Sequence, residues 1–392
     1  MSWQTVRLGD ICEIVSGATP KTSRKEYWDG DILWATPADL SKLDNAYISV
    51  TPRRITDAGL KSCAASVLPE HSVLLSSRAP IGHVAINTVP MATNQGFKSL
   101  VPNKKIADAK FLYHWLVANR SRIQSLGNGA TFKEISKSIV SSIEIFLPPL
   151  EEQRRIAAIL DKADALRQKR KQAIALLDSL TQSIFLEMFG DPFSDKQRND
   201  QKRVDFAEVT TRITYGFTQP MSHLESGIPI ITAKNVRNGH IDYGNVHYTS
   251  RSEFDRLTAK SKPEQGDLLI TKDGAIGRSA LVEGDAKFCI NQSVCLVKPR
   301  HDLIAGQYLL HYLLSGTVQS RIEAMKKGNA IPHLQITELA KFPIFIPNKR
   351  LQTKFADKVE RIGRVRAAGQ VTIAKATDLF SSLQHRAFSG QL

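Results

Sequence analysis

Charged and polar side chains stand at two tight turns of this sequence, and the two turns share one pattern. Each follows a strand-like run and is built around a glycine, Gly82 in the first turn and Gly277 in the second. The polar residues of the turns are Ser77, Arg78 and His83 in the first, and Lys272, Asp273 and Arg278 in the second. Arginine and lysine can hold a phosphate or the edge of a guanine, and aspartate can accept a hydrogen bond from cytosine. The turns therefore predict contacts with nucleic acid.

Two Asn-Gln pairs stand in corresponding places, Asn94-Gln95 and Asn291-Gln292. Their amides suit the edge of adenine, which offers one acceptor and one donor. Asparagine also caps turns through its own side chain. Both interpretations are open at this point.

Further candidates lie at strand ends and loop tips of the two halves. They are Trp34, Asn128 and Lys133 in the first half, and Lys234, Asn235, Asn329 and His333 in the second. A single polar loop of this kind would be weak evidence for binding of nucleic acid. Their recurrence in both halves of a basic chain favours a surface that reads nucleic acid.

The sequence lacks the motifs of several common catalytic sites. No glycine is followed directly by lysine, so there is no phosphate-binding loop of the Walker type, and no Glu-x-Lys closes a nuclease site. Pro148-Pro149 is preceded by leucine rather than by the asparagine or aspartate of an amino-methyltransferase. Gly127-Asn-Gly129 is too short a match for a cofactor loop, and His114 and His311 sit among aromatic residues that favour packing. We expect a chain without catalytic residues.

The chain repeats itself with a period of about half its 392 residues. The run 111–116, Phe-Leu-Tyr-His-Trp-Leu, returns at 308–313 as Tyr-Leu-Leu-His-Tyr-Leu, and Phe146-Leu-Pro148 returns as Phe345-Ile-Pro347. Such a period is too long for a solenoid unit, so each copy must be a whole domain. Short strand-like runs followed by a helix predict an α+β domain in each copy.

A different pattern follows each copy. From 150 to 188 there is no glycine or proline, and apolar residues recur at steps of three and four, as they do again from 355 to 387. This spacing predicts two long helices, each with an apolar stripe along one face. We expect the helices to pair as an antiparallel coiled coil that separates the two domains, which gives the chain pseudo-two-fold symmetry. Matching Leu180 with Leu383 predicts four more residues in the second helix, and Gly363 and Gly369 mark where it could bend.

The expected segments follow from these patterns. They are a first recognition domain at 1–148, a long helix at 149–189, a linker at 190–201, a second recognition domain at 202–347 and a second long helix at 348–392.

Composition narrows the class of partner. The formal charge is +15 with a pI near 9.6, and the excess is spread over both halves. A distributed basic excess indicates nucleic acid or an anionic membrane. No apolar run approaches the length of about 18 residues that spans a bilayer, and no signal peptide begins the chain, so membrane is disfavoured and a cytoplasmic location is expected. The four cysteines lack Cys-x-x-Cys spacing, which favours reduced, buried thiols over zinc.

Two further motifs carry a family resemblance. Residues 147–156 read Leu-Pro-Pro-Leu-Glu-Glu-Gln-Arg-Arg-Ile before a long helix that ends in Phe185-Leu-Glu-Met-Phe-Gly190, and the second helix ends in 383–390, Leu-Gln-His-Arg-Ala-Phe-Ser-Gly. Together with the repeat, the chain resembles the DNA-specificity subunit of Type I restriction-modification systems along its whole length.

The resemblance implies a non-catalytic adaptor with two target recognition domains, each reading one half of a bipartite, asymmetric site on double-stranded DNA. The long helices would fix the gap between the halves and dock two modification subunits, which methylate adenine at N6, and through them restriction subunits. No cofactor is expected in this chain, and S-adenosylmethionine, ATP and Mg²⁺ are expected in the partner subunits. Partner contacts are implied at Glu151, Glu152 and Gln153, and at Gln352, although the second copy lacks the paired glutamates.

Two other classes of protein compete with this interpretation. One is a self-contained DNA methyltransferase or nuclease with tandem recognition domains, which would need catalytic motifs that the sequence lacks. The other is a two-headed scaffold that binds acidic proteins, which a basic repeated chain also permits.

Overall fold

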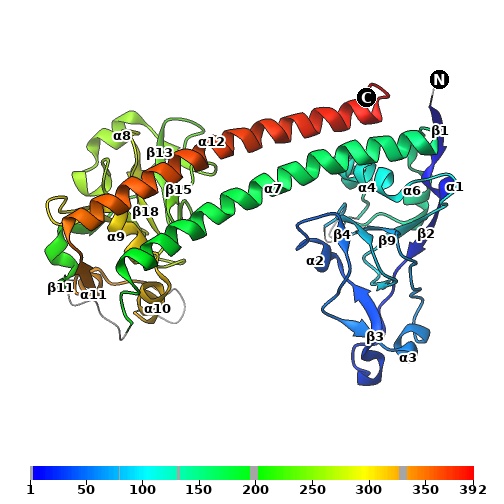
Figure 1. Cartoon of the computed structure of the whole chain (residues 1–392), viewed down its shortest axis with the longest axis horizontal. Coiled ribbons are helices and arrows are strands. Elements are labelled where there is room, and N and C mark those ends of the chain that lie inside the picture. The colour runs from blue at the N-terminus through cyan, green and yellow to red at the C-terminus, as the bar shows by residue number, and fades with distance from the viewer. Residues whose placement is uncertain (1–2, 79, 130–132, 195–201, 326–332) are drawn as a thin grey trace. The chain divides into compact units, whose positions relative to one another are not determined.

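The computed structural model describes residues 3–78, 80–129, 133–194, 202–325 and 333–392. The chain forms two compact units (Figure 1). The first unit contains residues 1–172 and 370–392, and the second contains residues 173–369. Two long helices, α7 (Leu150–Phe189) and α12 (Lys349–Phe388), each begin in one unit and end in the other. Each unit is therefore built from one sequence copy together with the end of the other copy's helix.

The first unit combines two main sheets with short helices. Its five-stranded sheet has the order β2-β9-β6-β7-β4, and its three-stranded sheet has the order β5-β3-β8. The strands are β1 (Gln4–Arg7), β2 (Cys12–Ser16), β3 (Trp28–Ala35), β4 (Tyr47–Ile48), β5 (Arg54–Ile55), β6 (Val73–Leu75), β7 (Val84–Asn87), β8 (Ala92–Thr93), β9 (Lys98–Pro102) and β10 (Glu144–Leu147). The helices are α1 (Leu8–Ile11), α2 (Pro37–Leu40), α3 (Asp57–Lys61), α4 (Ala109–Ala118), α5 (Arg120–Ser125) and α6 (Lys137–Ser142).

The second unit repeats this plan. Its four-stranded sheet has the order β12-β20-β17-β18, and its three-stranded sheet has the order β16-β13-β19. The strands are β11 (Lys202–Asp205), β12 (Thr210–Tyr215), β13 (Ile228–Ile231), β14 (Val236–Arg237), β15 (His240–Ile241), β16 (His247–Thr249), β17 (Leu268–Thr271), β18 (Ser279–Leu281), β19 (Cys289–Ile290), β20 (Val294–Pro299) and β21 (Pro343–Ile346). The helices are α8 (Arg251–Arg256), α9 (Gly306–Leu313), α10 (Gly316–Ala324) and α11 (Ile336–Ala340).

The repeated domains predicted from the sequence are confirmed by matching strand pairings. In the first unit β3 pairs with β5 antiparallel and with β8 parallel. In the second unit β13 pairs with β16 antiparallel and with β19 parallel. Each domain is also closed by its first and last strands, β1 with β10 and β11 with β21. Both copies are thus mixed α and β domains that share these pairings, although β4 adds a fifth strand to the main sheet of the first unit.

Both long helices contribute to the core of each unit. In the first unit Ile156 and Leu160 of α7 and Phe380 of α12 are buried with Phe111 of α4. In the second unit the end of α7 and the start of α12 meet in a cluster of aromatic rings. Phe185 lies 5.6 Å from both Tyr308 and Phe355, measured between ring centroids. Such clusters exclude water around the helix ends and favour one packing arrangement.

The predicted difference in helix length is wrong, because α7 and α12 each contain 40 residues. The error came from matching Leu180 with Leu383. Leu383 packs on the core of its unit as Ile184 does, whereas Leu180 is exposed. Helix α12 also runs without interruption through Gly363 and Gly369.

Gly369 allows the two helices to approach closely in the second unit. A β-carbon placed on Gly369 would lie 3.0 Å from Cδ1 of Ile174 in α7. A β-carbon on Gly363 would meet nothing within 4 Å. The close approach of α7 therefore explains the glycine at position 369, whereas no neighbour explains the glycine at position 363.

This difference can be measured with a matched pair of variants. G363A should stabilise the second unit by about 0.5–1 kcal/mol, because alanine loses less backbone entropy in a helix than glycine. G369A should gain less than G363A, since Ile174 must move to admit the new methyl group. Urea unfolding followed by circular dichroism measures both, and an equal or larger gain for G369A would contradict the close approach.

Candidate nucleic-acid interface

The two glycine turns predicted from the sequence have the same geometry. The Gly82 N–H donates to the Ser76 carbonyl over 3.0 Å, and the Gly277 N–H donates to the Thr271 carbonyl over 2.9 Å. Both glycines have positive φ, 91° and 83°. That region of backbone conformation favours glycine, which explains the residue at both turns.

Backbone hydrogen bonds place each turn between two other polar loops. In the first unit the Ser77 N–H donates to Gly96 over 2.7 Å, and the Ile135 N–H donates to the Ser77 carbonyl over 3.0 Å. The second unit repeats the bonds: the Lys272 N–H donates to Ser293 over 3.0 Å, and the Leu334 N–H donates to the Lys272 carbonyl over 2.8 Å. The structure therefore brings together, in each copy, the residues around the turn, the Asn-Gln pair and the loop that follows.

The charged residues at these turns have different partners in the two copies. In the first, the Glu134 carboxylate lies 3.2 Å from the Lys98 ammonium and 3.9 Å from the Arg78 guanidinium. In the second, Asp273 pairs with its neighbour Lys272 at 2.9 Å. The β-bridge that joins Arg78 to Glu134 has its counterpart in the bridge between Asp273 and His333. One scaffold thus carries different charges at the same place.

The asparagines of the Asn-Gln pairs cap their turns. The Asn94 side-chain oxygen accepts from the Gly96 N–H at 2.9 Å, and the Asn291 side-chain oxygen accepts from the Ser293 N–H at 3.1 Å. Gln95 and Gln292 are exposed beside them. The glutamines are therefore better placed for a base edge than the asparagines, although the Gln95 oxygen already accepts from the Thr19 hydroxyl.

Three residues expected at the interface lie inside the fold, which corrects their assignment as surface contacts. Trp34 is 2% exposed, and its indole N–H donates to the Ala18 carbonyl over 3.0 Å. Ser77 is fully buried. Asn235 is 4% exposed and uses its amide within the domain, accepting from Thr232 and donating to Asn245.

The remaining candidates divide by exposure. Those exposed are Gln95, Asn128, Lys133, Lys234 and Gln292. Those half-buried are Arg78, His83, Asn94, Lys272, Asp273, Arg278, Asn291 and His333. Asn329 lies outside the described residues. Burial, together with the nearby charge of Arg120, lowers the pKa of His83, so its ring is neutral at physiological pH.

Gln153 joins the first long helix to its domain. Its Oε1 accepts from the Asp108 N–H at 2.9 Å, and its Nε2 donates to the carbonyls of Ile106 and Pro148, both at 2.9 Å. The side chain is fully buried. Asp108 is the N-cap of α4, so the amide ties that helix to the start of α7.

Gln352 makes the same set of bonds in the second unit. Its Oε1 accepts from the Ala305 N–H at 2.7 Å, and its Nε2 donates to the carbonyls of Leu303 at 3.2 Å and Pro347 at 2.9 Å. Ala305 is the N-cap of α9. These bonds correct the expected role of Gln153 and Gln352, because neither side chain has an unused group for a partner.

Of the two glutamates beside Gln153, Glu151 is open to solvent and Glu152 is half-buried. Glu151 has 86% of its side chain exposed and pairs with Arg154, and Glu152 pairs with Arg155. Surface pairs of this kind contribute little to stability and can exchange partners. In the Glu-Glu-Gln motif, a partner would therefore meet the carboxylates, because the Gln153 amide is buried.

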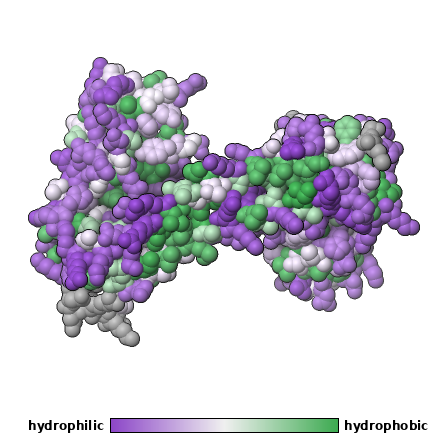
Figure 2. Space-filling view, turned by 45° about the horizontal axis from the view of Figure 1, so that its top comes forward, coloured by the Kyte–Doolittle hydropathy of each residue, from purple (hydrophilic) through white to green (hydrophobic). Residues whose placement is uncertain are grey.

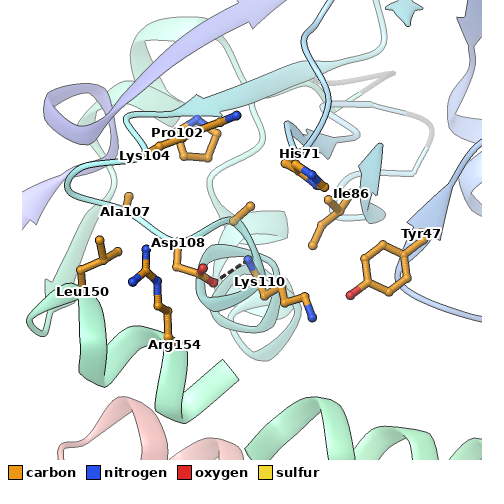
Figure 3. A pocket seen from close by; sticks show the side chains of 11 residues that line it. Tyr47, His71, Ile86, Pro102, Lys104, Ala107, Asp108, Lys110, Leu150 and Arg154 are labelled. Atoms are coloured by element: carbon orange, nitrogen blue, oxygen red, sulfur yellow. Dashed lines mark hydrogen bonds between the residues drawn. The ribbon is translucent and has the colours of Figure 1, made fainter. Parts of the chain in front are cut away.

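A pocket of about 480 Å³ lies beside this helix start (Figure 3). Lys104, Lys110 and Arg154 line it together with Tyr47 and Leu150.

An ion pair beside the pocket connects α4 with α7. The Lys110 ammonium lies 2.8 Å from the Asp161 carboxylate, which also contacts the buried His114 ring at 2.8 Å. Burial alone would raise the pKa of Asp161, but hydrogen bonds from His114 and Lys110 hold it below its usual value. The packing role expected for His114 agrees with this position in the core.

Three of the four cysteines are buried. Burial raises the pKa of Cys12, Cys289 and Cys295 to about 12, so these free thiols stay protonated. Within the described ranges no cluster of histidine, cysteine, aspartate or glutamate could hold a metal ion. No helix in the described part of the chain has the length and apolar character needed to cross a membrane.

The fold and the repeated polar turns define a tandem pair of DNA-specificity domains. A family model described as the Type I restriction modification DNA specificity domain matches residues 1–176 and 208–370. The chain belongs to this family.

Named relatives match along most of the chain. The Type I restriction enzyme MjaIX specificity subunit of Methanocaldococcus jannaschii is 28% identical, with 91% of this chain and 86% of the relative covered. The EcoKI specificity subunit of Escherichia coli K12 is 21% identical, with 100% and 89% covered.

Solved structures share the fold. The crystal structure of the S subunit from M. genitalium superposes with a TM-score of 0.57 at 16% identity, over 98% of this chain and 96% of that one. A chain solved in work on complex assembly and conformational transition of the type I R-M system gives a TM-score of 0.61 at 19% identity, over 100% and 98%.

The glutamine bonds predict a large effect from an isosteric change. Q153E places a carboxylate oxygen against the carbonyls of Ile106 and Pro148, so the first unit should lose at least about 2 kcal/mol of stability. All four tryptophans lie within residues 3–115, so tryptophan fluorescence during urea unfolding reports on that unit.

E151Q is the matched control, since it changes an exposed glutamate two positions away. Its unfolding midpoint should equal that of the unmodified chain. Equal midpoints for Q153E and E151Q would show that the buried amide does not hold the domain to α7.

Proposed function

We propose that this chain is the sequence-reading subunit of a Type I restriction-modification complex and that each domain reads one half of a bipartite, asymmetric DNA site. One observation carries the proposal: the two domains share a scaffold but differ in charge where Arg78 and Glu134 correspond to Asp273 and His333. Identical scaffolds with different polar groups are suited to two different half-sites.

The chemistry of each turn suits a particular base. Arg78 carries two parallel N–H donors that match O6 and N7 of guanine, whereas Asp273 can accept from the amino group of cytosine. Gln95 and Gln292 can accept from and donate to adenine. The excess of positive charge adds sequence-independent attraction to phosphates, which sets the register on the duplex.

Methyl transfer and cleavage belong to partner subunits in this proposal. S-adenosylmethionine, ATP and Mg²⁺ would be bound there, and the target adenine would leave the stack to be methylated. The complex would act in the cytoplasm, where this chain would dock two modification subunits.

The docking surface would include the long helices. Exposed Glu151, with the half-buried Glu152 beside it, offers one contact at the start of α7, while Lys349 and Arg350 are exposed at the start of α12. Apolar side chains along both helices are also exposed: Leu166, Leu176, Leu180, Val365, Val371 and Leu379. Figure 2 shows apolar patches within the mostly polar surface. Exposed apolar residues in such number favour a protein partner.

The long helices would also set the gap between half-sites. Ile174 lies so near Gly369 in the second unit that an added β-carbon would be 3.0 Å from its Cδ1, and the Arg167 guanidinium carbon lies 4.7 Å from the centre of the Phe380 ring in the first. Contacts between α7 and α12 in both units support an antiparallel coiled coil, since the beginning of each helix meets the end of the other.

The competing classes of protein predict different binding. A self-contained methyltransferase would transfer methyl groups without partners. A scaffold for acidic proteins would release DNA to any excess polyanion, whereas a specificity subunit should hold its cognate site in competition with non-specific DNA.

Exchange of one domain tests the two-reader proposal. Replacing residues 1–148 with the first domain of a relative of different specificity should change one half of the methylated site only, because the second domain keeps its own side chains. Sequencing of methylated positions in a host that carries the modification subunits measures this. A change in both halves would contradict separate readers.

Shortening the second helix tests the spacer. Deleting Arg364 to Ala367 removes about one turn, roughly 6 Å, against about 3.4 Å of rise for each base pair. The preferred gap should shift by about one or two base pairs while the half-sites stay the same. The assay is methylation of a DNA library with fixed half-sites and variable gaps. An unchanged preferred gap in a folded, active variant would show that the helices do not set the distance between half-sites.

A further inference from the structure

Arg53 and His247 occupy the same position in the two domains. Ile55 and Thr249 each precede the residue that caps a helix, Thr56 for α3 and Ser250 for α8. Ile55 pairs with Ile32 of β3, and Thr249 pairs with Ile228 of β13. Counting back two residues from each leads to Arg53 and His247. No similarity in sequence marks this pair, because arginine stands in one copy and histidine in the other.

The Arg53 guanidinium lies over the rings of two tryptophans. Its guanidinium carbon lies 3.9 Å from the centre of the Trp28 ring and 5.1 Å from that of Trp34. Trp34 is buried, and the two indoles meet edge to face at 5.1 Å. A ring attracts a guanidinium through its π face and offers no acceptor in its plane, so the N–H groups of the guanidinium stay available as donors.

A local irregularity of β3 brings Trp28 to this place. The pairing with β5 shifts register between Trp28 and Ile32, and Asp29 has a φ of 60°. A β-carbon on Gly30 would lie 2.6 Å from Cα of Thr56, so only glycine fits beside that backbone. Bulges and positive φ at a non-glycine residue are costly and recur where a side chain must be aimed.

His247 is stacked in the same manner by a different partner. Its ring lies parallel to that of His223, with centroids 4.3 Å apart and planes 9° apart, and both residues are exposed. A neutral imidazole carries one donor and one acceptor at its edge.

Glu253 fixes the segment that carries His223. Its carboxylate accepts from the hydroxyl and the N–H of Ser222 and, at 2.7 Å, from the hydroxyl of Thr249. These hydrogen bonds, first that of the Ser222 side chain, lower the pKa of Glu253 to about 2. The carboxylate therefore stays ionised at physiological pH and keeps the segment in place.

Both stacks lie next to the polar turns already described. In the first unit the Trp34 indole donates to Ala18, and the Ala18 N–H donates to Thr93, which adjoins the Asn94-Gln95 pair. In the second unit His247 pairs with Ile230, which packs with Phe217. The Gln292 N–H in turn donates to the Phe217 carbonyl.

No carboxylate among the described residues forms an ion pair with Arg53, in contrast to Arg78 and Lys272. Its charge and its donors are therefore free for a ligand. A rigid, planar, uncompensated guanidinium at the margin of a DNA-reading surface matches the edge of guanine, which presents two acceptors to a bidentate donor.

We propose that position 53 in the first domain and position 247 in the second are specificity-determining positions, with Arg53, stacked on Trp28, reading a guanine in one half-site and His247, stacked on His223, reading a different base in the other. The inference rests on the proposed function as a DNA-reading subunit. It deepens that function by naming one pair of equivalent residues that makes the two half-sites unlike.

The test uses the full chain purified with its modification subunits and a double-stranded DNA library with random bases in both half-sites. Bound DNA is sequenced, and the preference at each base position is compared between variants. R53K keeps the charge but loses the planar fork, so it should reduce the preference for guanine at one position of one half-site roughly tenfold or more. H247A should relax one position of the other half-site and leave the first half unchanged.

R54K is the matched control for Arg53. Arg54 directly follows Arg53, is the first residue of β5 and is also exposed, and successive side chains of an extended segment alternate in direction. The R54K complex should show the same base preference as the unmodified complex at every position. R53A serves as a second variant that removes the side chain beyond Cβ, and circular dichroism spectra equal to those of the unmodified complex establish that each variant is folded.

Two results would overturn the proposal. One is unchanged base preference in both R53K and R53A. The other is a uniform loss of binding to all sequences with a shallower dependence on salt, which is the behaviour of a phosphate contact. Failure of the unmodified complex to select any bipartite sequence would instead refute the proposed function itself.

Discussion

A buried glutamine amide at the start of each long helix is the contact that unites the elements of both domains. Gln153 and Gln352 each satisfy one N–H and two carbonyl groups of the backbone. Polar backbone groups buried without partners would cost about 1–3 kcal/mol each. The amide therefore makes the helix start, the preceding proline and the N-cap of the aromatic helix one rigid joint, so that the loops of a domain keep a fixed direction relative to its helix.

The joint allows the two copies to differ in their loop residues while they share one frame. The apolar cores around the two joints resemble each other, with Phe111 and Tyr308 buried in the equivalent helices α4 and α9. At the loops, Arg78 corresponds to Asp273 and Arg53 to His247. A change of charge at a loop tip leaves the packing of the frame intact, so these loop residues can vary without loss of stability.

The sequence predicted those features that depend on local chemistry. The glycine turns at Gly82 and Gly277 were predicted because their backbone conformation favours that residue, and the long helices because their apolar period is distinct. Burial was not predictable in the same way: Trp34 and Asn235 look like surface polar or aromatic groups until their hydrogen-bond partners are known. The stack of Arg53 on Trp28 was missed because its residues are distant in sequence and differ between copies.

Hydrogen exchange at two backbone amides tests the central role of the glutamine joint. Asp108 and Ala305 are N-cap residues, whose N–H groups have no partner within their own helices, and among the described residues the glutamine oxygens are the acceptors that protect them. Both amides should exchange as slowly as those of Leu112 and Leu309, which lie within the same helices. Rapid exchange at Asp108 and Ala305 in the folded chain would contradict the account.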